Sequence, residues 1–146
     1  MFKITIMVKI FILSAYSTNS PNQLGTGQIK IEGGPLYDLV RVQTLVDDPD
    51  AINFITDKCR RDLHNLFDSD TEQVAALIQA LDTQDYIDSE WCENGKSGVA
   101  ACDAYSISRA EVIPATGKAT TLEYFLKFAI GKTGQLVLMV SCHLSR

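Results

Sequence analysis

The sequence predicts an α+β fold in which helices pack on one face of an antiparallel β-sheet. Apolar residues recur at helical spacing over residues 37–81, whereas turn residues and strand-like runs fill the chain after Tyr86. Helices followed by strands are typical of this class. With 146 residues, 46% of them hydrophobic, the chain is long enough for one well-packed core. We therefore expect a single domain over residues 35–146, preceded by an extension over residues 1–34.

The extension begins with a run that imitates a secretory signal, MFKITIMVKIFILSAYS. Lys9 interrupts this run, and its longest uninterrupted apolar stretch, residues 10–13, is shorter than a signal core and far too short to span a membrane. The alternatives are an N-terminal strand, a start at Met7, or a secreted small domain. Residues 17–35 are rich in Ser, Asn, Gly and Pro around the alternation QIKIE, which predicts a loose segment with at most one small strand.

Three helices are predicted in the first half of the domain. The first runs from Tyr37 to the breaker motif DDP. The second lies within residues 50–66, where Thr56 can cap the helical part. The third covers residues 70–81, because Ser69 opens an S-x-x-E capping box followed by apolar residues at helical spacing.

Strands are predicted for the second half. Residues 99–113 form one strand, with Tyr105 and Ile107 on the same face. A turn-rich PATGKAT follows, and the apolar runs 124–130 and 135–143 then form a hairpin around GKTG.

The predicted register of this hairpin places Lys127 and His143 far apart. If GKTG is a four-residue loop, Ile130 pairs with Gln135. Lys127 and His143 then lie ~16 Å apart and on opposite faces of the sheet. A bulge would bring His143 to the face of the lysine without closing that gap, so we expect no direct contact between them.

The net charge of −5 is distributed unevenly. Residues 35–90 carry 13 acidic and 4 basic side chains. A nucleic-acid-binding surface normally has a basic footprint, which only the chain ends and the short run Lys58, Arg60 and Arg61 could supply. The charge therefore argues mildly against nucleic acid, and it allows a basic partner to dock on the acidic part.

The four cysteines, at positions 59, 92, 102 and 142, follow no zinc-binding spacing, so no metal site is predicted. We expect reduced thiols and a cytoplasmic protein rather than disulfides. The glycines at 25, 27, 33 and 34 lack the spacing of a phosphate-binding loop, so no nucleotide cofactor is predicted.

Few side chains stand out as candidates for chemistry. His64 lies in a predicted helix, where a structural role is expected, whereas His143 ends a strand and could reach the mouth of a cleft. Lys127 interrupts an apolar strand, either as a solvated lysine or as a cation held for a phosphate. Tyr105 is either a core residue or a neighbour of that site. Cys142 cannot pair with His143 because adjacent strand residues point to opposite faces.

Six segments from Pro35 onward occur in an order that resembles the MqsR family of toxins from bacterial toxin-antitoxin systems. The resemblance spans about 110 residues and does not cover the first 34. Its weight rests on the order and spacing of the segments, which are PLYDLVRVQTLV, FITDKCRRD, VAALIQALDTQDYIDS, CDAY, LEYFLKFAI and LVLMVSCHLS.

The resemblance implies a RelE-like, microbial ribonuclease-like fold with a twisted antiparallel sheet. It also implies a cytosolic endoribonuclease that cleaves mRNA, and a cognate antitoxin protein that neutralises it. Lys127 and Tyr105 match recurrent family positions, and His143 fits a known family variation.

RNA cleavage through the 2′-OH needs a base, an acid and cations for the phosphate, and positioned acid-base groups typically contribute ~10²- to 10⁴-fold. Our hypothesis assigns His143 as acid or base, with Asp88 or Tyr105 as its counterpart. The groups assigned to the phosphate are cationic: Lys58, Arg60, Arg61 and Lys127. The alternative is a non-catalytic interaction protein of the same fold that binds a basic partner.

Overall fold

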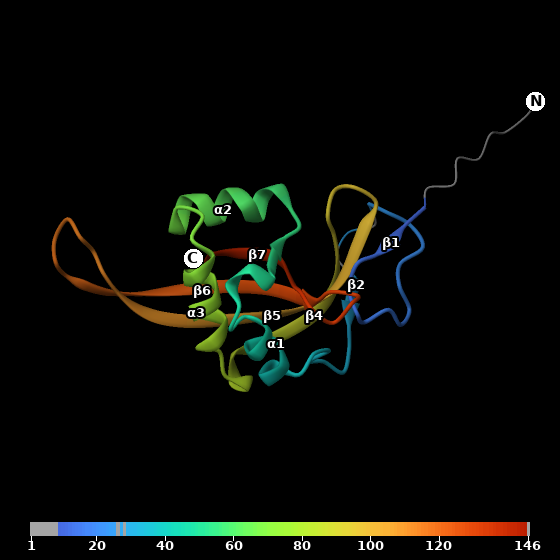
Figure 1. The fold of residues 1–146 in the computed structure, drawn as a ribbon, viewed down its shortest axis with the longest axis horizontal. Helices are drawn as coiled ribbons and strands as arrows, with labels where there is room; N and C mark the ends of the chain where they lie inside the picture. The colour runs from blue at the N-terminus through green and yellow to red at the C-terminus, as the bar shows by residue number, and fades with distance from the viewer. Residues whose placement is uncertain (1–8, 26, 28, 146) are drawn as a thin grey trace, which may run out of the picture.

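The computed structural model describes residues 9–25, 27 and 29–145. Within these residues the fold is α+β, as predicted, with three helices and one large, mostly antiparallel sheet of seven strands (Figure 1). None of the helices described is long and apolar enough to cross a membrane. The alternatives for the start of the chain, namely a signal, a strand or a start at Met7, fall largely on residues 1–8 and lie outside the described residues.

The elements follow one another in the order β1-β2-α1-β3-α2-α3-β4-β5-β6-β7. The helices are α1 (Leu39–Leu45), α2 (Asp57–Phe67) and α3 (Thr71–Gln79), and the strands are β1 (Phe11–Ile12), β2 (Ile29–Ile31), β3 (Ile52–Phe54), β4 (Tyr86–Glu93), β5 (Gly98–Val112), β6 (Ala119–Ile130) and β7 (Val137–Leu144). The strand order is β2-β4-β5-β6-β7-β3, with β1 beside β5 off this path. The pairs β1–β5 and β3–β7 are parallel, and the other pairs are antiparallel.

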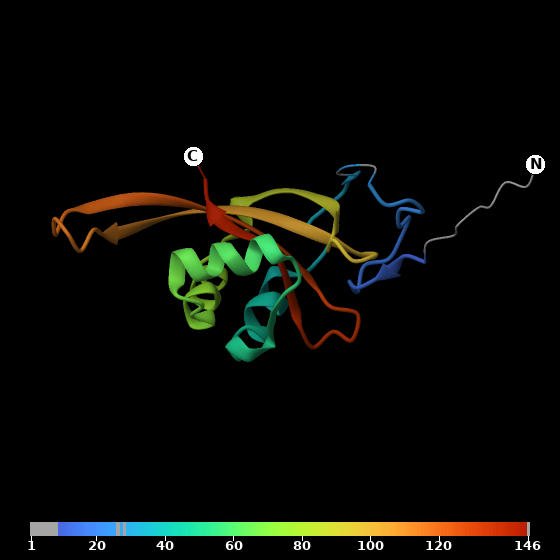
Figure 2. The ribbon, with the colours of Figure 1, turned by 90° about the horizontal axis from the view of Figure 1, so that it is seen from above.

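All three helices lie on one side of the sheet (Figure 2). Val42 of α1, Leu63 of α2 and Leu77 of α3 belong to one buried cluster with Leu126 and Phe128 of β6. Burying a large apolar side chain stabilises the fold by about 1.5–3 kcal/mol. This cluster is therefore the main source of stability, and it seals the helix-covered face of the sheet from water.

The starts of α2 and α3 show how well local capping was predictable. Thr56 caps α2 as predicted, since its hydroxyl accepts a hydrogen bond from the Cys59 amide at 3.1 Å. The predicted Ser69 cap of α3 is wrong, because Asp70 accepts from the Glu72 amide at 3.0 Å instead. Ser69 has a left-handed φ of 64° and belongs to the tight link between the two helices.

Two strands were not predicted from the spacing of apolar residues. Residues 52–54, inside the segment predicted to hold a helix, form β3 and pair with β7. Residues 86–93 form β4, whose central residues are buried in succession on both faces of the sheet. Burial on both faces removes the clean polar-apolar alternation by which a strand is recognised.

The segment before Pro35 adds two short strands to the sheet. The small strand predicted in QIKIE is confirmed as β2, and β1 pairs with the start of β5. A second buried cluster, centred on Trp91, packs against Ile12 and Ile31 from this segment.

Asp103 of β5 ties the same region to the sheet. Its buried carboxylate accepts hydrogen bonds from the Leu36 and Tyr37 amides and from the Ser89 hydroxyl, at 2.6–3.0 Å. Burial raises the pKa of Asp103, because an apolar environment disfavours the ionised form. The carboxylate therefore fixes the connection between β2 and α1.

The long hairpin of β5 and β6 extends beyond the helices (Figures 1 and 2). β4 pairs with β5 only as far as Tyr105, and β7 pairs with β6 only from Tyr124. Residues 106–123 therefore form a two-stranded arm. Within the described chain its strands pair with each other, apart from one backbone hydrogen bond of 2.8 Å from the Ser145 amide to Glu123 oxygen. We call this segment the β5–β6 arm.

Candidate functional site

The observed register of β6 and β7 differs from the predicted one. Ile130 pairs with Val137 rather than Gln135, and a bulge between Lys127 and Phe128 adds one more residue of offset. Lys127 therefore pairs with Ser141. The total shift of three residues is odd, and an odd shift transfers a side chain to the other face of the sheet.

This shift brings His143 to the face that carries Lys127. His143 pairs with Phe125, only two residues or about 7 Å along β6 from Lys127. The predicted ~16 Å separation on opposite faces is wrong. The loop between β6 and β7 spans residues 131–136 and is wider than GKTG, and the N-terminal segment contacts it: the Lys132 amide donates to Leu13 oxygen at 2.9 Å.

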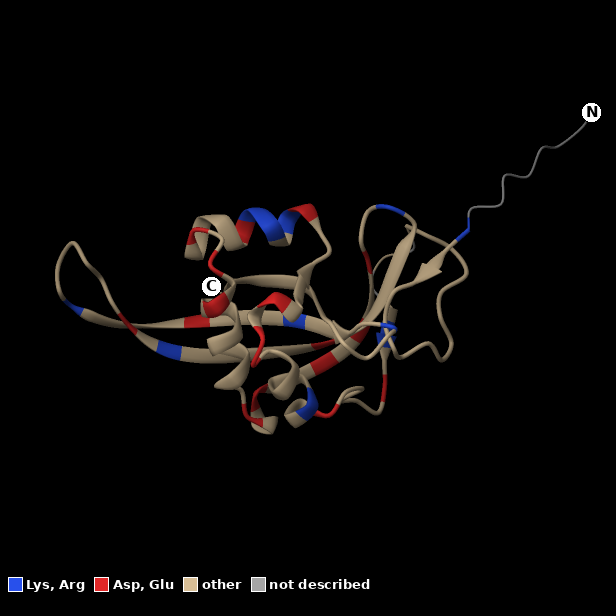
Figure 3. Cartoon of the chain, in the orientation of Figure 1, with Lys and Arg blue, Asp and Glu red and all other residues tan. Residues whose placement is uncertain are grey.

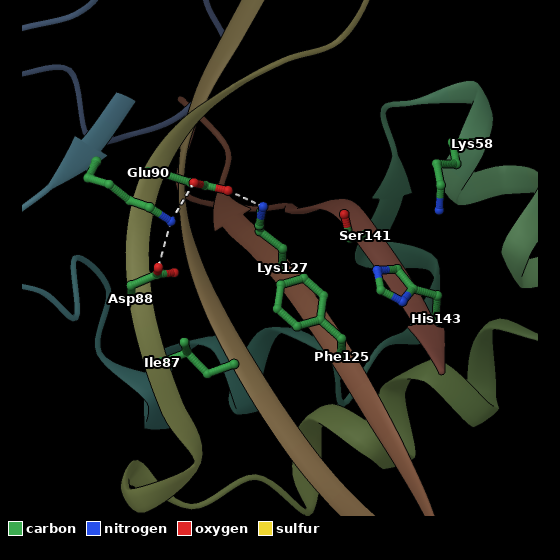
Figure 4. Close-up of a pocket in the computed structure, with 9 residues that line it drawn as sticks. Lys58, Ile87, Asp88, Glu90, Phe125, Lys127, Ser141 and His143 are labelled. Atoms are coloured by element: carbon green, nitrogen blue, oxygen red, sulfur yellow. Dashed lines mark hydrogen bonds and ion pairs between the residues drawn. The ribbon is translucent and has the colours of Figure 1, made fainter. Parts of the chain in front are cut away.

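The face of the sheet opposite the helices carries a cleft of about 360 Å³. Figure 4 shows side chains from β4, β6 and β7 converging on it. It is lined by charged, aromatic and hydroxyl groups: Lys30, Lys58, Ile87, Asp88, Glu90, Phe125, Lys127, Ser141 and His143.

Four of these groups form a chain of alternating charge along the β4 side of the cleft. The Lys30 ammonium binds Asp88 Oδ2 at 2.7 Å and Glu90 Oε2 at 2.9 Å, and Glu90 Oε1 binds the Lys127 ammonium. Hydrogen bonds to both carboxylates raise the pKa of Lys30. Glu90 and Lys127 are buried, with 1% and 6% of their surfaces exposed, so each needs the other as a counter-ion.

His143 lies on the opposite side of the cleft, on the last strand. Its ring stacks on Phe125 with centroids 5.1 Å apart, and the Lys127 ammonium lies 5.5 Å from the centroid of the same Phe125 ring. His143 Nδ1 lies 3.1 Å from Leu144 oxygen. A carbonyl oxygen only accepts, so Nδ1 carries the hydrogen in the neutral ring and Nε2 is left to accept a proton.

The structure brings together four of the residues predicted from sequence. Asp88, Lys127, His143 and Lys58 all line the cleft. Lys58 does so from the first turn of α2, where it also pairs with Asp62 at 2.8 Å.

The other three predicted residues lie elsewhere. Tyr105 is 1% exposed on the helix-covered face, where it stacks on Phe128 with centroids 5.3 Å apart, and burial raises its pKa. Arg60 and Arg61 are exposed on α2, and neither lines the cleft. Figure 3 shows that basic side chains form a band on this helix. Arg60 is paired with Asp57 at 2.6 Å.

Glu90, Lys30, Phe125 and Ser141 line the cleft but were not predicted. Asp88 and Glu90 are two residues apart, which places both on one face of a strand. That spacing could have revealed the pair if residues 86–93 had been recognised as β4. Lys30 falls in the predicted small strand, but no sequence pattern indicates that β2 pairs with β4.

Among the described residues, no group of three or more His, Cys, Asp or Glu side chains is arranged to hold a metal ion. The four cysteines are buried free thiols. Burial raises the pKa of Cys59 and of Cys142 to about 12.

Comparison of the chain with protein-family models, with curated proteins and with solved structures finds no match. The resemblance to MqsR toxins therefore rests on the six sequence segments.

Proposed function

We propose that the protein is an endoribonuclease that cleaves RNA by metal-independent attack of the 2′-OH. The observation that carries the proposal is that one cleft holds His143, Asp88, Lys127 and Lys58. These side chains supply the acid, the base and the cations that the reaction needs. In the same proposal the fold is RelE-like and the protein is a toxin of the MqsR type.

In this proposal, two groups on opposite sides of the cleft transfer the protons. β4 and β7 are separated by β5 and β6, so their backbones lie about 14 Å apart, at ~4.8 Å for each strand spacing. A phosphodiester bound between them would face Asp88 on one side and His143 on the other. One group takes the 2′-OH proton, and the other protonates the leaving 5′-oxygen.

The bonds made and broken follow from this arrangement. The 2′-oxygen attacks phosphorus as its proton leaves, and the bond to the 5′-oxygen breaks as that oxygen gains a proton. The products are a 2′,3′-cyclic phosphate and a free 5′-hydroxyl. Lys127 and Lys58 stabilise the negative charge that accumulates on the phosphoryl oxygens.

The proposed partner is a cognate antitoxin protein that neutralises this activity in the cytoplasm. Its support is the sequence resemblance alone. A short neighbouring reading frame that encodes two CxxC pairs and a helix-turn-helix pattern would strengthen this part of the proposal.

The experiment compares the two histidines of the chain. Purified wild-type protein, His143→Gln and His64→Gln are each incubated with a long RNA at neutral pH in the presence of a chelator. We expect wild type and His64→Gln to produce fragments ending in 2′,3′-cyclic phosphate, and His143→Gln to cleave at least about 100-fold more slowly. His64 is the matched control because it lies on α2 and does not line the cleft. Equal rates for the two variants would remove His143 from the mechanism.

One observation favours the alternative, a non-catalytic protein that binds a basic partner. All three lysines that line the cleft, Lys30, Lys58 and Lys127, are already paired with carboxylates. The segment that contains the helices, residues 35–90, is strongly acidic. RNA that stays intact when it is incubated with folded wild-type protein would support this alternative.

A further inference from the structure

We propose that Lys30 is a positioning residue of the cleft, supplied by the N-terminal segment to hold Asp88 and Glu90 together and to orient Glu90 toward Lys127. The inference rests on the proposed function of this cleft. It assigns a role in the site to residues that precede Pro35, which the sequence resemblance does not cover.

Backbone pairing brings Lys30 to this place. In the antiparallel β2–β4 pair, Lys30 lies directly opposite Glu90, so both side chains stand on the same face of the sheet. Its neighbours Ile29 and Ile31 lie opposite Trp91 and Ser89. Ile31 also packs against the buried cluster around Trp91 on the other face, which anchors the strand that carries Lys30.

The Lys30 ammonium reduces the repulsion between two carboxylates on β4. Asp88 and Glu90 are like charges two residues apart on one face, and the Glu90 side chain is only 2% exposed. The Lys30 ammonium lies between them and binds one oxygen of each. The second oxygen of Glu90 is then directed to Lys127 (Figure 4).

Removing this ammonium would leave two carboxylates to compete for Lys127. Lys127 would be drawn toward β4, away from the place where it meets a phosphate, and Asp88 would lose its one ion-pair partner in the described structure. Lys30 neutralises Asp88 and Glu90 rather than contacting a phosphate, so its loss changes the charge of the cleft by one unit without removing a contact to RNA. Its loss should therefore slow the chemical step more than it weakens binding.

The test measures RNA cleavage by Lys30→Met, Lys30→Arg and Lys96→Met. Lys96→Met is the matched control, because it removes the same charge from an exposed turn between β4 and β5 that does not line the cleft. We expect Lys30→Met to lower kcat at least about tenfold while KM changes less than about threefold. Lys30→Arg should recover most of kcat, and Lys96→Met should behave as wild type.

Fluorescence of Trp91 separates positioning from detachment of the segment. Trp91 is the single tryptophan of the chain and lies opposite Ile29, so its emission reports whether β2 stays paired with β4. Unchanged emission in Lys30→Met, together with the loss of kcat, supports positioning. A red shift that accompanies the loss, or a kcat equal to that of wild type, overturns it.

The ammonium resonance of Lys127, observed by ¹H–¹⁵N NMR, provides a readout without RNA. Lys30 and Lys127 share the carboxylate of Glu90, so this resonance should shift in Lys30→Met and return toward its wild-type position in Lys30→Arg. If wild type leaves RNA intact, the proposed function fails while this measurement still tests whether Lys30 positions the cleft. An unmoved Lys127 resonance in Lys30→Met would overturn the inference even in an active enzyme.

Discussion

The two faces of the central sheet are built from the same strands but differ in almost every physical property. On β6, Leu126 and Phe128 pack into the apolar cluster under the helices, whereas Phe125 and Lys127 line the cleft. The strand alternation thus assigns stability to one face and charge to the other. Substitutions at neighbouring positions should therefore have separable effects on stability and on activity.

Phe128 and Phe125 provide the sharpest test, because they are the same residue type on the same strand. Phe128→Ala should destabilise the protein by about 3–5 kcal/mol, since Phe128 is buried and its removal leaves a cavity. Phe125→Ala should cost about 1 kcal/mol or less, because its side chain is half-buried at a cleft, but it should slow RNA cleavage by loosening His143. Urea unfolding of both variants measures the two costs. Similar costs would break the distinction between the faces.

The buried ion pair tests whether the charges on the cleft face depend on one another. Glu90→Leu should destabilise the protein by about 2–4 kcal/mol, because Lys127 is left buried without its counter-ion. The double variant Glu90→Leu/Lys127→Leu should recover much of that loss. Asp62→Asn is the control, since it breaks the more exposed Lys58–Asp62 pair and should cost less than about 1 kcal/mol. Strict additivity of the two leucine substitutions would contradict this dependence.

Substitution of Asp103 should have the smallest of these effects on the free energy of unfolding, and its effect should depend on pH. Its pKa is raised by burial, so between its ordinary pKa and the raised value the native state binds more protons than the unfolded chain. This group therefore makes stability decrease as the pH rises through that window. Asp103→Asn should remove that component and cost about 1–2 kcal/mol through weaker hydrogen bonds.

Unfolding free energies of wild type and Asp103→Asn, measured from pH 3.5 to 7, isolate this component as a difference. The difference should change across the window and be constant at higher pH. A difference that is flat throughout would mean that Asp103 titrates alike in the folded and unfolded states.

Local features of the fold were predictable where short-range chemistry decides them. Thr56 caps α2 because a hydroxyl at the start of a helix satisfies a free amide, which needs no distant partner. Ser69 fitted a capping pattern equally well but was displaced by Asp70, because the turn between α2 and α3 required a left-handed residue at position 69. β4 was missed because the segments that bury its two faces lie far away from it in the sequence.

The candidate site was only half predictable for the same reason. His143 and Lys127 could be selected as unusual residues on apolar strands, but their proximity depends on a bulge in β6 and on a β6–β7 loop that is wider than GKTG. Tyr105 was expected to be either a core residue or a neighbour of the site, since its alternation pattern does not indicate which side the helices cover, and the structure places it in the core. Lys30 reaches Glu90 only through the pairing of β2 with β4, which connects residues about 60 positions apart.

The β5–β6 arm exposes two strand edges to solvent, and such edges are templates on which another chain can add a strand. Val112 and Ile113 at its end are exposed apolar residues that would favour such addition. Charged side chains interrupt both edges: Arg109 and Glu111 on β5, and Glu123 on β6. A second copy that added to either edge would have to desolvate these charges, so the arm can remain long without promoting aggregation.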